Sequence, residues 1–340
     1  MISSLPRLPW HALVIVLVTG TLLWLFFRNV DLAELWAAIA RADPTLIGLA
    51  IALTGATYVL RAWRWQALLR PIGPARFRTA FRTTVIGFTA TFLLPGRVGE
   101  VLRPYLLARQ EGFKVPSTFA TVLIERLLDL AVVLLLFACA LLFVPVEIAP
   151  EIEWAGSAAA VLALGGLLAL FLVAGHPERL GRGAGRLTRW LPPRIAETAE
   201  HLVRTFAEGL AVMRRPGPLL LAVMWSVPLW VSIALGIWVT SAAFNLTVSF
   251  LGSFLVMMFL VVGVSAPTPG GVGGFHYFYK LAVTTFFGAD PDTAAAAALV
   301  LHAISFVPVT LVGLVFMSQD GLTIGGLRHL RRTAERAEGL

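Results

Sequence analysis

SAPTPGGVGGFHYFYK, from Ser265 to Lys280, places four glycines and two prolines between two strongly apolar segments. LLPGRVGEVLRPY, from Leu93 to Tyr105, has a similar pattern, since its Pro-Gly-Arg-Val-Gly aligns with Pro-Gly-Gly-Val-Gly in the first stretch. Proline and glycine are the residues that interrupt a helix most strongly. The chain is therefore predicted to break its helical backbone twice in the same way, and the fold depends on what surrounds the two breaks.

The composition around the breaks is that of a membrane protein. Hydrophobic residues make up 58% of the 340 and charged residues only 14%, which a soluble chain of this size does not need for its core. The first long apolar run has no small-residue cleavage site and is followed by further runs, so we interpret it as a retained helix. The runs of spanning length are His11–Phe27, Thr45–Leu60, Thr118–Val144, Trp154–Ala174, Pro218–Phe244 and Thr293–Met317, with additional runs at Phe77–Leu94 and Ser249–Ala266.

The basic residues predict the orientation. The net charge is +8, but the arginines gather in separate connections, between Arg61 and Arg82 and between Arg179 and Arg215, and in the tail. The connection Pro145–Glu153 has three glutamates and no basic residue. By the positive-inside rule the arginine-rich connections and both termini are cytoplasmic and the acidic connection is outside. We expect no nucleic-acid partner, and the preference for arginine over lysine favours a bacterial inner membrane.

Counting crossings from a cytoplasmic N-terminus makes two segments begin and end on one side. Residues 77–116 start and finish inside, and residues 249–292 start and finish outside. We therefore predict an all-α polytopic protein with about six full spans and two re-entrant helical hairpins of opposite orientation. Because a spanning helix with a similar start follows each hairpin, the hairpins indicate an inverted-topology repeat.

These boundaries predict a single transmembrane domain over residues 1–340. Repeat 1 covers about 45–144 with the hairpin 77–116, and repeat 2 covers about 218–318 with the hairpin 249–292. A cytoplasmic amphipathic linker, 175–217, joins them, and its helical pattern favours a position on the inner leaflet. The alternative is that the interrupted runs are full spans joined by ordinary glycine turns, giving about eight to ten crossings.

Broken helices at bilayer depth leave backbone amides and carbonyls without helical partners, so they are tolerated only beside a cavity or within protein. Half-helix N-termini at such a break favour an anion, and glycine lets a ligand approach the amides. The glycines expected to contribute to a substrate site are Gly96, Gly99, Gly270, Gly271, Gly273 and Gly274.

Charged residues concentrate at the first break and on the helix after it. Arg97, Glu100 and Arg103 follow the break, while Glu125, Arg126 and Asp129 lie within a span, where ionisable groups need a partner or a polar cavity. The arginines suit a phosphate headgroup because a guanidinium is a planar fork of donors. The alternative is a structural network in which Arg97 or Arg103 only neutralises Glu125 and Asp129.

The second break and one helix end supply further candidates. His276, Tyr277, Tyr279 and Lys280 carry polar tips near the second break, with His276 taken as a substrate-binding candidate or a core histidine, and His302 shares that ambiguity. Arg61 and Arg64 lie in YVLRAWRW at a predicted cytoplasmic helix end. Snorkelling at the interface is the simpler interpretation for both arginines, and headgroup recruitment is the alternative.

Soluble-enzyme motifs are missing from the sequence. Cys139 is the single cysteine, and the chain has no P-loop, no His-Glu-x-x-His pair and no Gly-x-Ser-x-Gly elbow, so we expect no metal and no cofactor. Asp290-Pro-Asp292 spells the acidic motif of metal-dependent sugar transferases, but its place before an alanine-rich helix favours an N-cap.

With both breaks in view, FLLPGRVGEVLRPYLLARQEG, TVLIERLLDL and PTPGGVGGFHYF resemble the lysylphosphatidylglycerol synthase transmembrane-domain family, also called the flippase-like domain. The resemblance covers roughly residues 10–320. In the multiple peptide resistance factor this domain moves aminoacylated phosphatidylglycerol between leaflets. The resemblance implies that Arg97, Glu100, Arg103, Glu125, Arg126 and Asp129 fall on the polar motif of the family and Gly270 to Gly274 on its second glycine motif. We expect a standalone member without the synthase domain.

The expected function is a lipid translocase for an anionic or aminoacylated phospholipid, or for a lipid linked to polyprenyl phosphate. A membrane-embedded transferase with a lipid-linked donor is one alternative, for which Asp290, Asp292 and His276 are the suspects. A non-catalytic membrane partner of a separate lipid synthase is another. Membrane lipids are the expected partners, and a separate lipid-modifying enzyme and a second copy of the chain stay open.

Overall fold

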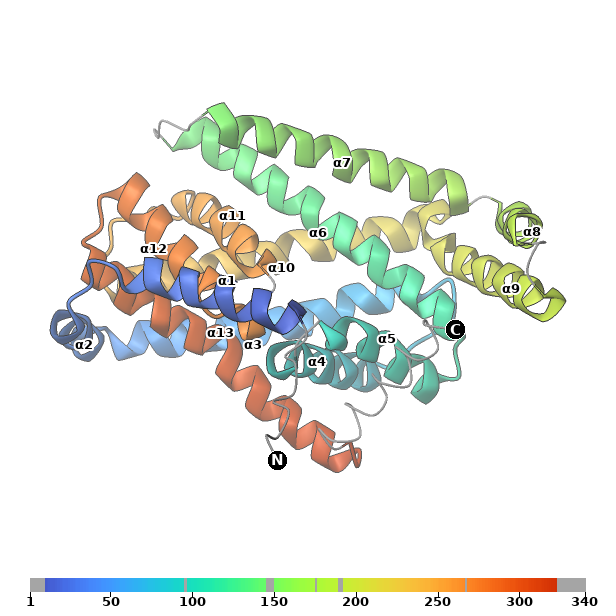
Figure 1. Cartoon of the computed structure of the whole chain (residues 1–340), viewed down its shortest axis with the longest axis horizontal. Helices are drawn as coiled ribbons and strands as arrows, with labels where there is room; N and C mark the ends of the chain where they lie inside the picture. Colours follow the sequence, from blue (N-terminus) through green and yellow to red (C-terminus); the bar gives the residue numbers. More distant parts are fainter. Residues whose placement is uncertain are drawn as a thin grey trace, which may run out of the picture.

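The computed structural model describes residues 10–94, 97–144, 150–174, 176–188, 192–266 and 268–322. Throughout these residues the chain is helical, without strands, as predicted (Figure 1). The helices are α1 (Trp10–Phe27), α2 (Leu32–Arg41), α3 (Pro44–Leu69), α4 (Phe77–Leu93), α5 (Val98–Glu111), α6 (Val115–Phe143), α7 (Pro150–Ala174), α8 (Pro177–Leu187), α9 (Pro193–Gly209), η1 (Leu210–Arg214), α10 (Pro216–Ala243), α11 (Gly252–Ser265), η2 (Pro269–Gly271), α12 (Gly274–Phe287) and α13 (Pro291–Gln319).

Among the described residues, four helices are long and apolar enough to cross a membrane: α3, α6, α10 and α13. The count rises to six if the bent pair of α1 and α2, which meet at 77°, and the pair of α7 and α8 each form one span. The upper count equals the six full spans predicted from the sequence. A bilayer core is about 30 Å thick, whereas a helix of 14 residues such as α11 is about 21 Å long. The four helices beside the two breaks are all shorter than a usual span, so the alternative of eight to ten crossings is not supported.

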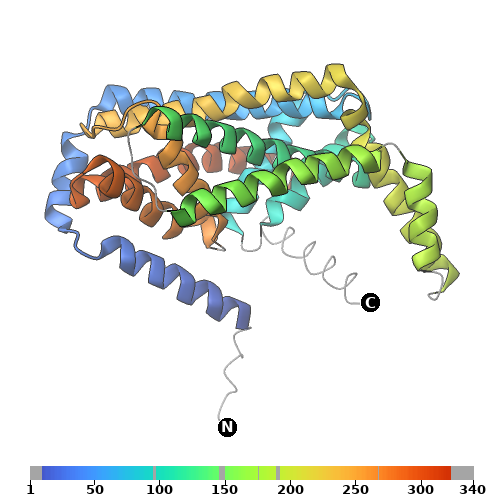
Figure 2. The same ribbon diagram turned by 90° about the horizontal axis from the view of Figure 1, so that it is seen from above.

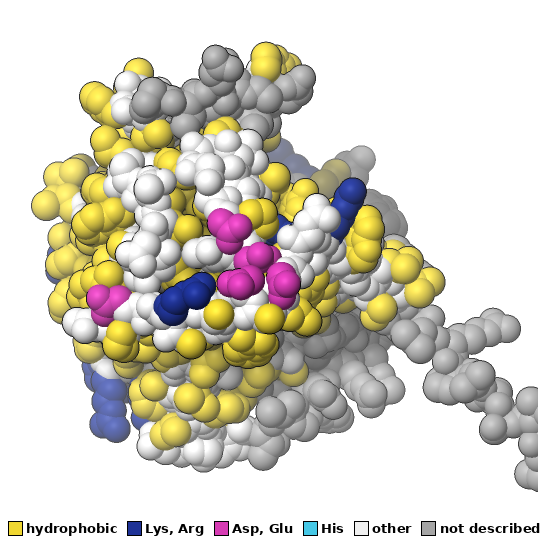
Figure 3. Space-filling model, turned by 90° about the vertical axis from the view of Figure 1, so that its left-hand side faces the viewer, with side chains coloured by type: hydrophobic (Ala, Val, Ile, Leu, Met, Phe, Trp, Pro, Cys, Tyr) yellow, Lys and Arg dark blue, Asp and Glu magenta, His cyan; other side chains and the backbone are white. Residues whose placement is uncertain are grey.

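The long helices run between two chemically different ends of the bundle. At one end the backbone N–H of Asp31 donates to Asp292 Oδ1 at 2.7 Å, and Asp43 N–H donates to the Ala243 carbonyl at 3.0 Å. These contacts bring together α2, the start of α3, the end of α10 and the α12–α13 connection, and this face displays a group of carboxylates (Figure 3). At the other end Lys114 pairs with Glu208 at 3.0 Å, joining the start of α6 to α9.

The short helices form two hairpins that enter from opposite ends. Arg76, just before α4, pairs with Glu111 at the end of α5 at 3.1 Å, so the first hairpin opens at the end that carries α9. Thr247, just before α11, donates to the Phe287 carbonyl at the end of α12 at 3.4 Å, so the second hairpin opens at the carboxylate end. This opposition agrees with the predicted hairpins, while the inverted repeat and its residue limits stay predictions.

Glycines allow the two arms of each hairpin to touch. A Cβ on Gly99 would overlap the carbonyl oxygen of Gly87, and a Cβ on Gly274 would overlap the carbonyl oxygen of Gly263. The breaks themselves need left-handed backbone, with φ of 53° at Arg97 and 69° at Gly271, the two residues that the sequence alignment of the breaks pairs. Glycine adopts this conformation without strain, whereas an arginine there is uncommon.

The two breaks lie against each other inside the bundle. The helix α4 packs against η2, and the backbone of Gly270 approaches so closely that an added Cβ would lie 3.5 Å from the carbonyl oxygen of Phe92. Around them α3 and α10 pack along their lengths, and α1 lies to one side, against α12 (Figure 2). The fold thus brings into one place two broken helical segments that lie in different halves of the chain.

The predicted linker forms α8, α9 and η1. Its helix α9 packs on α6, where Ser117 Oγ donates to the Thr205 carbonyl at 2.7 Å. Ile195 and Leu202, seven residues apart, stay exposed on α9, as a helix that contacts lipid would have them. The predicted positions of the termini lie outside the described residues, as does the first part, 145–149, of the acidic connection Pro145–Glu153. The last part of that connection, 150–153, is not a loop but the start of α7.

Candidate functional site

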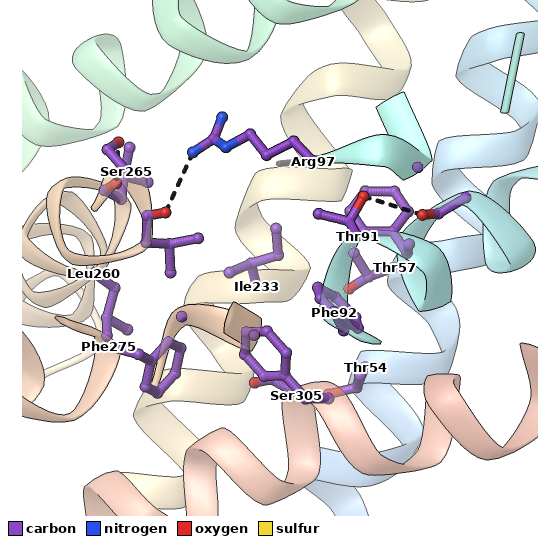
Figure 4. A pocket seen from close by; sticks show the side chains of 18 of the residues that line it. Thr54, Thr57, Thr91, Phe92, Arg97, Ile233, Leu260, Ser265, Phe275 and Ser305 are labelled. Carbon is purple, nitrogen blue, oxygen red and sulfur yellow. Dashed lines mark hydrogen bonds between the residues drawn. The ribbon is translucent and has the colours of Figure 1, made fainter. Parts of the chain in front are cut away.

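A cavity of about 650 Å³ lies where the two breaks meet. Its wall takes residues from α1, α3, α4, α5, α6, α10, α11, η2, α12 and α13, so nearly every membrane-embedded element contributes to it. The close-up shows Arg97 reaching across one side, with Phe275, Leu260 and Ile233 forming an apolar wall (Figure 4). The volume is in the range of pockets that hold small molecules and headgroups.

The lining is divided into a charged part and an apolar part. The charged residues of the wall are Arg61, Arg97, Glu100, Arg103 and Arg126. Hydroxyl groups of Thr54, Thr57 and Ser305 are also on the wall, beside the aromatic and aliphatic side chains (Figure 4). Such a division suits a ligand with a charged head and an apolar tail.

A buried ion-pair network stands behind the charged part. Glu125 Oε1 lies 2.8 Å from Arg103 Nη1 and 3.2 Å from Arg64 Nη2. Arg64 Nη1 also donates to Asp129 Oδ1, and its side chain is completely buried. Arg126 lies farther away, 3.7 Å from Glu125 and 3.6 Å from Asp129. The carboxylates therefore hold arginines from three different helices, α3, α5 and α6, in fixed positions.

Two tryptophans support the network. Trp65 lies under the Arg103 guanidinium, 3.9 Å from ring centroid to carbon, and its Nε1 donates to Thr121 Oγ1 at 3.0 Å. Trp230 Nε1 donates to Asp129 Oδ1 at 2.9 Å. Stacking on an aromatic face compensates an arginine for lost water without using its N–H groups. Arg103 Nη1 donates to Glu125, while Nε and Nη2 have no hydrogen-bond partner among the described residues.

Arg61 differs from the other arginines of the cluster. Its guanidinium lies over the rings of Phe88, at 4.9 Å, and Trp230, at 6.0 Å. The residue is only 8% exposed, and within the described part of the chain no carboxylate lies within ion-pair distance of it. It is a buried cation on the cavity wall that is held by aromatic faces.

Several guanidinium N–H groups at this end of the cavity have no hydrogen-bond partner among the described residues. They belong to Arg61 (Nη1), Arg103 (Nε and Nη2) and Arg126 (Nε). Within the cluster, four arginine charges face the two carboxylates of Glu125 and Asp129, which leaves an excess of two positive charges. Burying unpaired charge and unpaired donors costs several kcal/mol, so this part of the cavity has the charge and the donors that an anion would match.

Arg97 and Glu100 lie at the mouth of the cavity. They pair with each other at 3.6 Å, with 53% and 36% of their side chains exposed. Arg97 Nη2 also donates to the carbonyl oxygen of Val264 on the second hairpin at 3.3 Å (Figure 4). The side chain thus connects the two hairpins across the cavity.

The predicted site residues separate into three groups in the structure. Arg97, Glu100, Arg103, Arg126, Gly99, Gly270, Gly271 and Arg61 line the cavity. Glu125 and Asp129 lie behind the arginines, and Gly273, Gly274 and His276 are close to the cavity but not on its wall. Gly96 lies outside the described residues.

One sequence interpretation is wrong, and another holds for only one of its two arginines. Arg61 and Arg64 do not snorkel to an interface, because their side chains are buried and Arg64 is at the centre of the ion-pair network. Arg97 does not neutralise Glu125 or Asp129, because its carboxylate partner is Glu100 at the mouth. The alternative of a structural network is correct for Arg103 in that Arg103 neutralises Glu125. It is incomplete because Arg103 also lines the cavity.

The polar residues after the second break have other contacts. Tyr279 and Ser241 share a hydrogen bond of 2.8 Å in the core. Lys280 Nζ donates to the carbonyl oxygens of Phe26, at 2.7 Å, and Arg28, at 3.0 Å, and so holds the end of α1. His276 is buried against the ring of His302. His302 Nε2 lies 2.8 Å from the Gly270 carbonyl and fixes the break from behind.

Both carboxylates of the Asp290-Pro-Asp292 motif are engaged in helix ends. Asp290 Oδ2 accepts from the backbone N–H of Thr293 at 2.9 Å as the N-cap of α13, as the sequence favoured. Asp292 accepts from the backbone N–H of Asp31. Among the residues that the structure describes, no group of three His, Cys, Asp or Glu side chains is arranged to hold a metal ion.

The sequence did not single out Trp65 or Trp230, and it gave Arg64 the wrong role. A signal for Arg64 was present, because Arg61 and Arg64 are three apart on a helix and therefore share a face. Glu125 and Asp129, four apart, also share a face. A pair of arginines on one helix face and a pair of carboxylates on another are natural partners where both lie in a membrane.

Comparison with known proteins gives relatives over nearly the whole chain. The model of a family described as the lysylphosphatidylglycerol synthase TM region matches residues 11–313. A UPF0104 membrane protein of Methanothermobacter thermautotrophicus is 26% identical, covering 93% of this chain and 94% of its own length. The glycosyltransferase AglD of Haloferax volcanii is 25% identical over 91% of this chain, which spans 54% of that relative.

Proposed function

Because the chain belongs to the lysylphosphatidylglycerol synthase transmembrane family, we propose that it is a lipid translocase that moves the headgroup of an anionic lipid between the leaflets of a membrane. The headgroup occupies the cavity at the two breaks, and the acyl or prenyl chains stay in the bilayer. Anionic or aminoacylated phospholipids and lipids linked to polyprenyl phosphate are the substrate classes for this activity.

One observation supports the proposal above all others. Arg61 and Arg103 line a largely apolar cavity, and each has a buried guanidinium nitrogen without a hydrogen-bond partner among the described residues. Guanidinium groups bind phosphate oxygens with two parallel hydrogen bonds, and they do so more strongly where water is excluded. An apolar remainder of the cavity is suited to the first part of a lipid tail.

The opposed hairpins offer a way for the headgroup to pass. Each hairpin opens toward one end of the bundle, and the breaks touch where Gly270 meets Phe92. Arg97 lies at the mouth, and Arg126, Arg61 and Arg103 follow with decreasing exposure. A phosphate therefore meets arginines successively as it moves inward. Movement of one hairpin against the other would then open the cavity toward the second leaflet, as in transporters built from broken helices.

Purified protein in liposomes with fluorescent lipids of several headgroups tests the proposal. Quencher accessibility reports how fast each lipid changes leaflet. We expect movement well above that of empty liposomes, and a loss of at least about tenfold in Arg103→Gln, because one charge-assisted phosphate contact contributes more than about 1.4 kcal/mol. Arg41→Gln, an exposed arginine at the carboxylate end, is the matched control. Absence of any lipid movement by the wild-type chain would refute the translocase.

A membrane-embedded transferase is the second candidate, because the relative from Haloferax volcanii is named a glycosyltransferase. The carboxylates suspected for that chemistry, Asp290 and Asp292, accept backbone hydrogen bonds at the carboxylate end and do not line the cavity. Asp292→Asn distinguishes the two functions. A transferase that uses this carboxylate would lose its activity, whereas a translocase would retain its rate.

For the setting, we place the protein in a bacterial inner membrane with both termini in the cytoplasm. The arginine-rich connections of the sequence support this orientation. A separate lipid-modifying enzyme and a second copy of the chain are further partners under the same proposal. Accessibility of single cysteines placed at Arg41 and Glu208, which lie at opposite ends of the bundle, would test the orientation in cells.

A further inference from the structure

The arginine cluster at the cavity has two more positive than negative charges, and this excess indicates how many negative charges the headgroup carries. The cluster of Arg61, Arg64, Arg103 and Arg126 faces only Glu125 and Asp129 among the described residues. The pair of Arg97 and Glu100 at the mouth adds no net charge. A ligand that balances this site carries two negative charges in a small volume.

Four of the five charged residues on the described cavity wall are arginines. Glu125 and Asp129 have one oxygen each without a hydrogen-bond partner among the described residues, but neither residue lines the cavity. Glu100 is the carboxylate of the described cavity wall, and it is already beside Arg97. An amine in the cavity would therefore face the excess of arginine charge, with Glu100, which lies beside Arg97, as the one carboxylate on the described wall.

From this arrangement we infer that the headgroup is a terminal phosphate monoester, and that a headgroup made cationic by an added amine is disfavoured. A monoester has close to two negative charges at neutral pH and three oxygens that accept hydrogen bonds. A phosphodiester has one charge and two such oxygens, so it would leave one positive charge of the cluster unbalanced. This inference rests on the proposed function and selects among its substrate classes.

Two kinds of membrane lipid carry a terminal phosphate monoester. Phosphatidate carries a terminal phosphate on two acyl chains, and a polyprenyl phosphate carries it on one isoprenoid chain. The cluster contacts only the phosphate, so both lipids are expected to bind. Phosphatidylglycerol and its lysyl ester, which has a cationic amine, are expected to bind more weakly, in that order.

Competition binding to the full-length protein in nanodiscs tests the inference. A fluorescent phosphatidate is bound first, and unlabelled phosphatidate, polyprenyl phosphate, phosphatidylglycerol or lysylphosphatidylglycerol is added as the competitor. Comparing phosphatidate with polyprenyl phosphate shows whether the protein prefers acyl or prenyl chains on the phosphate. We expect either terminal phosphate to compete at least about tenfold better than phosphatidylglycerol, which equals about 1.4 kcal/mol. Lysylphosphatidylglycerol is expected to compete weakest.

Variants link the preference to the cluster. Arg61→Gln removes one excess charge and is expected to reduce the preference for monoester over diester, whereas Arg61→Lys retains the charge and most of the preference. Arg126→Gln, on a partly exposed side chain, makes the same test if Arg61→Gln does not fold. Arg41→Gln is the control. An unchanged preference in both folded glutamine variants would overturn the role of the cluster.

The outcomes separate this inference from the proposed function. If phosphatidylglycerol or its lysyl ester competes as well as phosphatidate, and lipids still change leaflet in liposomes, the inference is wrong and the translocase stands. If no lipid binds and none moves, both are wrong. If monoesters bind best, the inference holds, and the better of the two monoester lipids identifies the tail.

Discussion

Replacing Glu125 by glutamine removes one of the two negative charges that hold the arginine cluster together. The side chain is completely buried, and its Oε1 lies 2.8 Å from Arg103 and 3.2 Å from Arg64. Glutamine has nearly the same shape, so the change creates no cavity. The perturbation is therefore almost purely electrostatic, and it raises the excess positive charge of the cluster from two to three.

The expected cost follows from burial. Removing one partner of a buried ion pair destabilises a protein by about 3–5 kcal/mol, because the remaining charge stays buried without a partner. The exposed pair of Lys114 and Glu208 has side chains that are 60% and 41% exposed. Removing such a pair costs about 0–1 kcal/mol, because water replaces the lost partner. The two glutamates should thus differ by about 2 kcal/mol or more.

The measurement is thermal unfolding in detergent, followed by the loss of the monodisperse peak after heating, for wild type, Glu125→Gln and Glu208→Gln. For a chain of this size about 1 kcal/mol corresponds to roughly 2 °C in Tm, so Glu125→Gln should lower Tm by at least about 6 °C. Glu208→Gln should change it by at most about 2 °C. Equal shifts in the two variants would refute the view that the buried network stabilises the fold.

Three other predictions concern the hairpins. Gly99→Ala should destabilise the first hairpin by about 1–3 kcal/mol, because its Cβ would overlap the Gly87 carbonyl; thermal unfolding should show a lower Tm than for Gly217→Ala, which has open space around it. Arg97→Gly should preserve or raise Tm by relieving the left-handed backbone, which costs about 1 kcal/mol or more for arginine, yet change lipid movement because the bond to the second hairpin is lost; a loss of stability without a change in transport would contradict this. Lys280→Met should release the end of α1, so limited proteolysis should cut after α1 faster than in wild type, and unchanged protection would show that other contacts hold α1.

The acidic face has a structural explanation that limits its functional meaning. Asp31 caps α2, with its Oδ1 accepting from Ala33 N–H at 2.7 Å, and Asp43 caps α3 in the same way at 2.8 Å. Asp290 caps α13. Helix N-termini at this end of the bundle each favour an aspartate, so carboxylates gather on this face (Figure 3) without forming a site.

The sequence by itself determined the class of fold and the positions of the breaks. Apolar length predicted the long helices, and proline with glycine predicted the interruptions near Gly99 and Gly271, because these effects depend on local covalent structure and on the bilayer. The sequence also identified Glu125, Arg126 and Asp129 as a polar group within a span, and Arg103 as a charged residue after the first break, since charge in a membrane needs a partner. The limits of the repeat remain predictions.

The tertiary structure alone decided which charges meet. Arg64 reaches Glu125 and Asp129, and Trp230 reaches Asp129 from α10, because α3, α6 and α10 pack together. Helical periodicity gives the face of a residue but not its neighbour on another helix. For this reason Arg61 resembled an interfacial anchor in the sequence, while the packed bundle buries it on the cavity wall, with no hydrogen-bond partner for its Nη1 among the described residues.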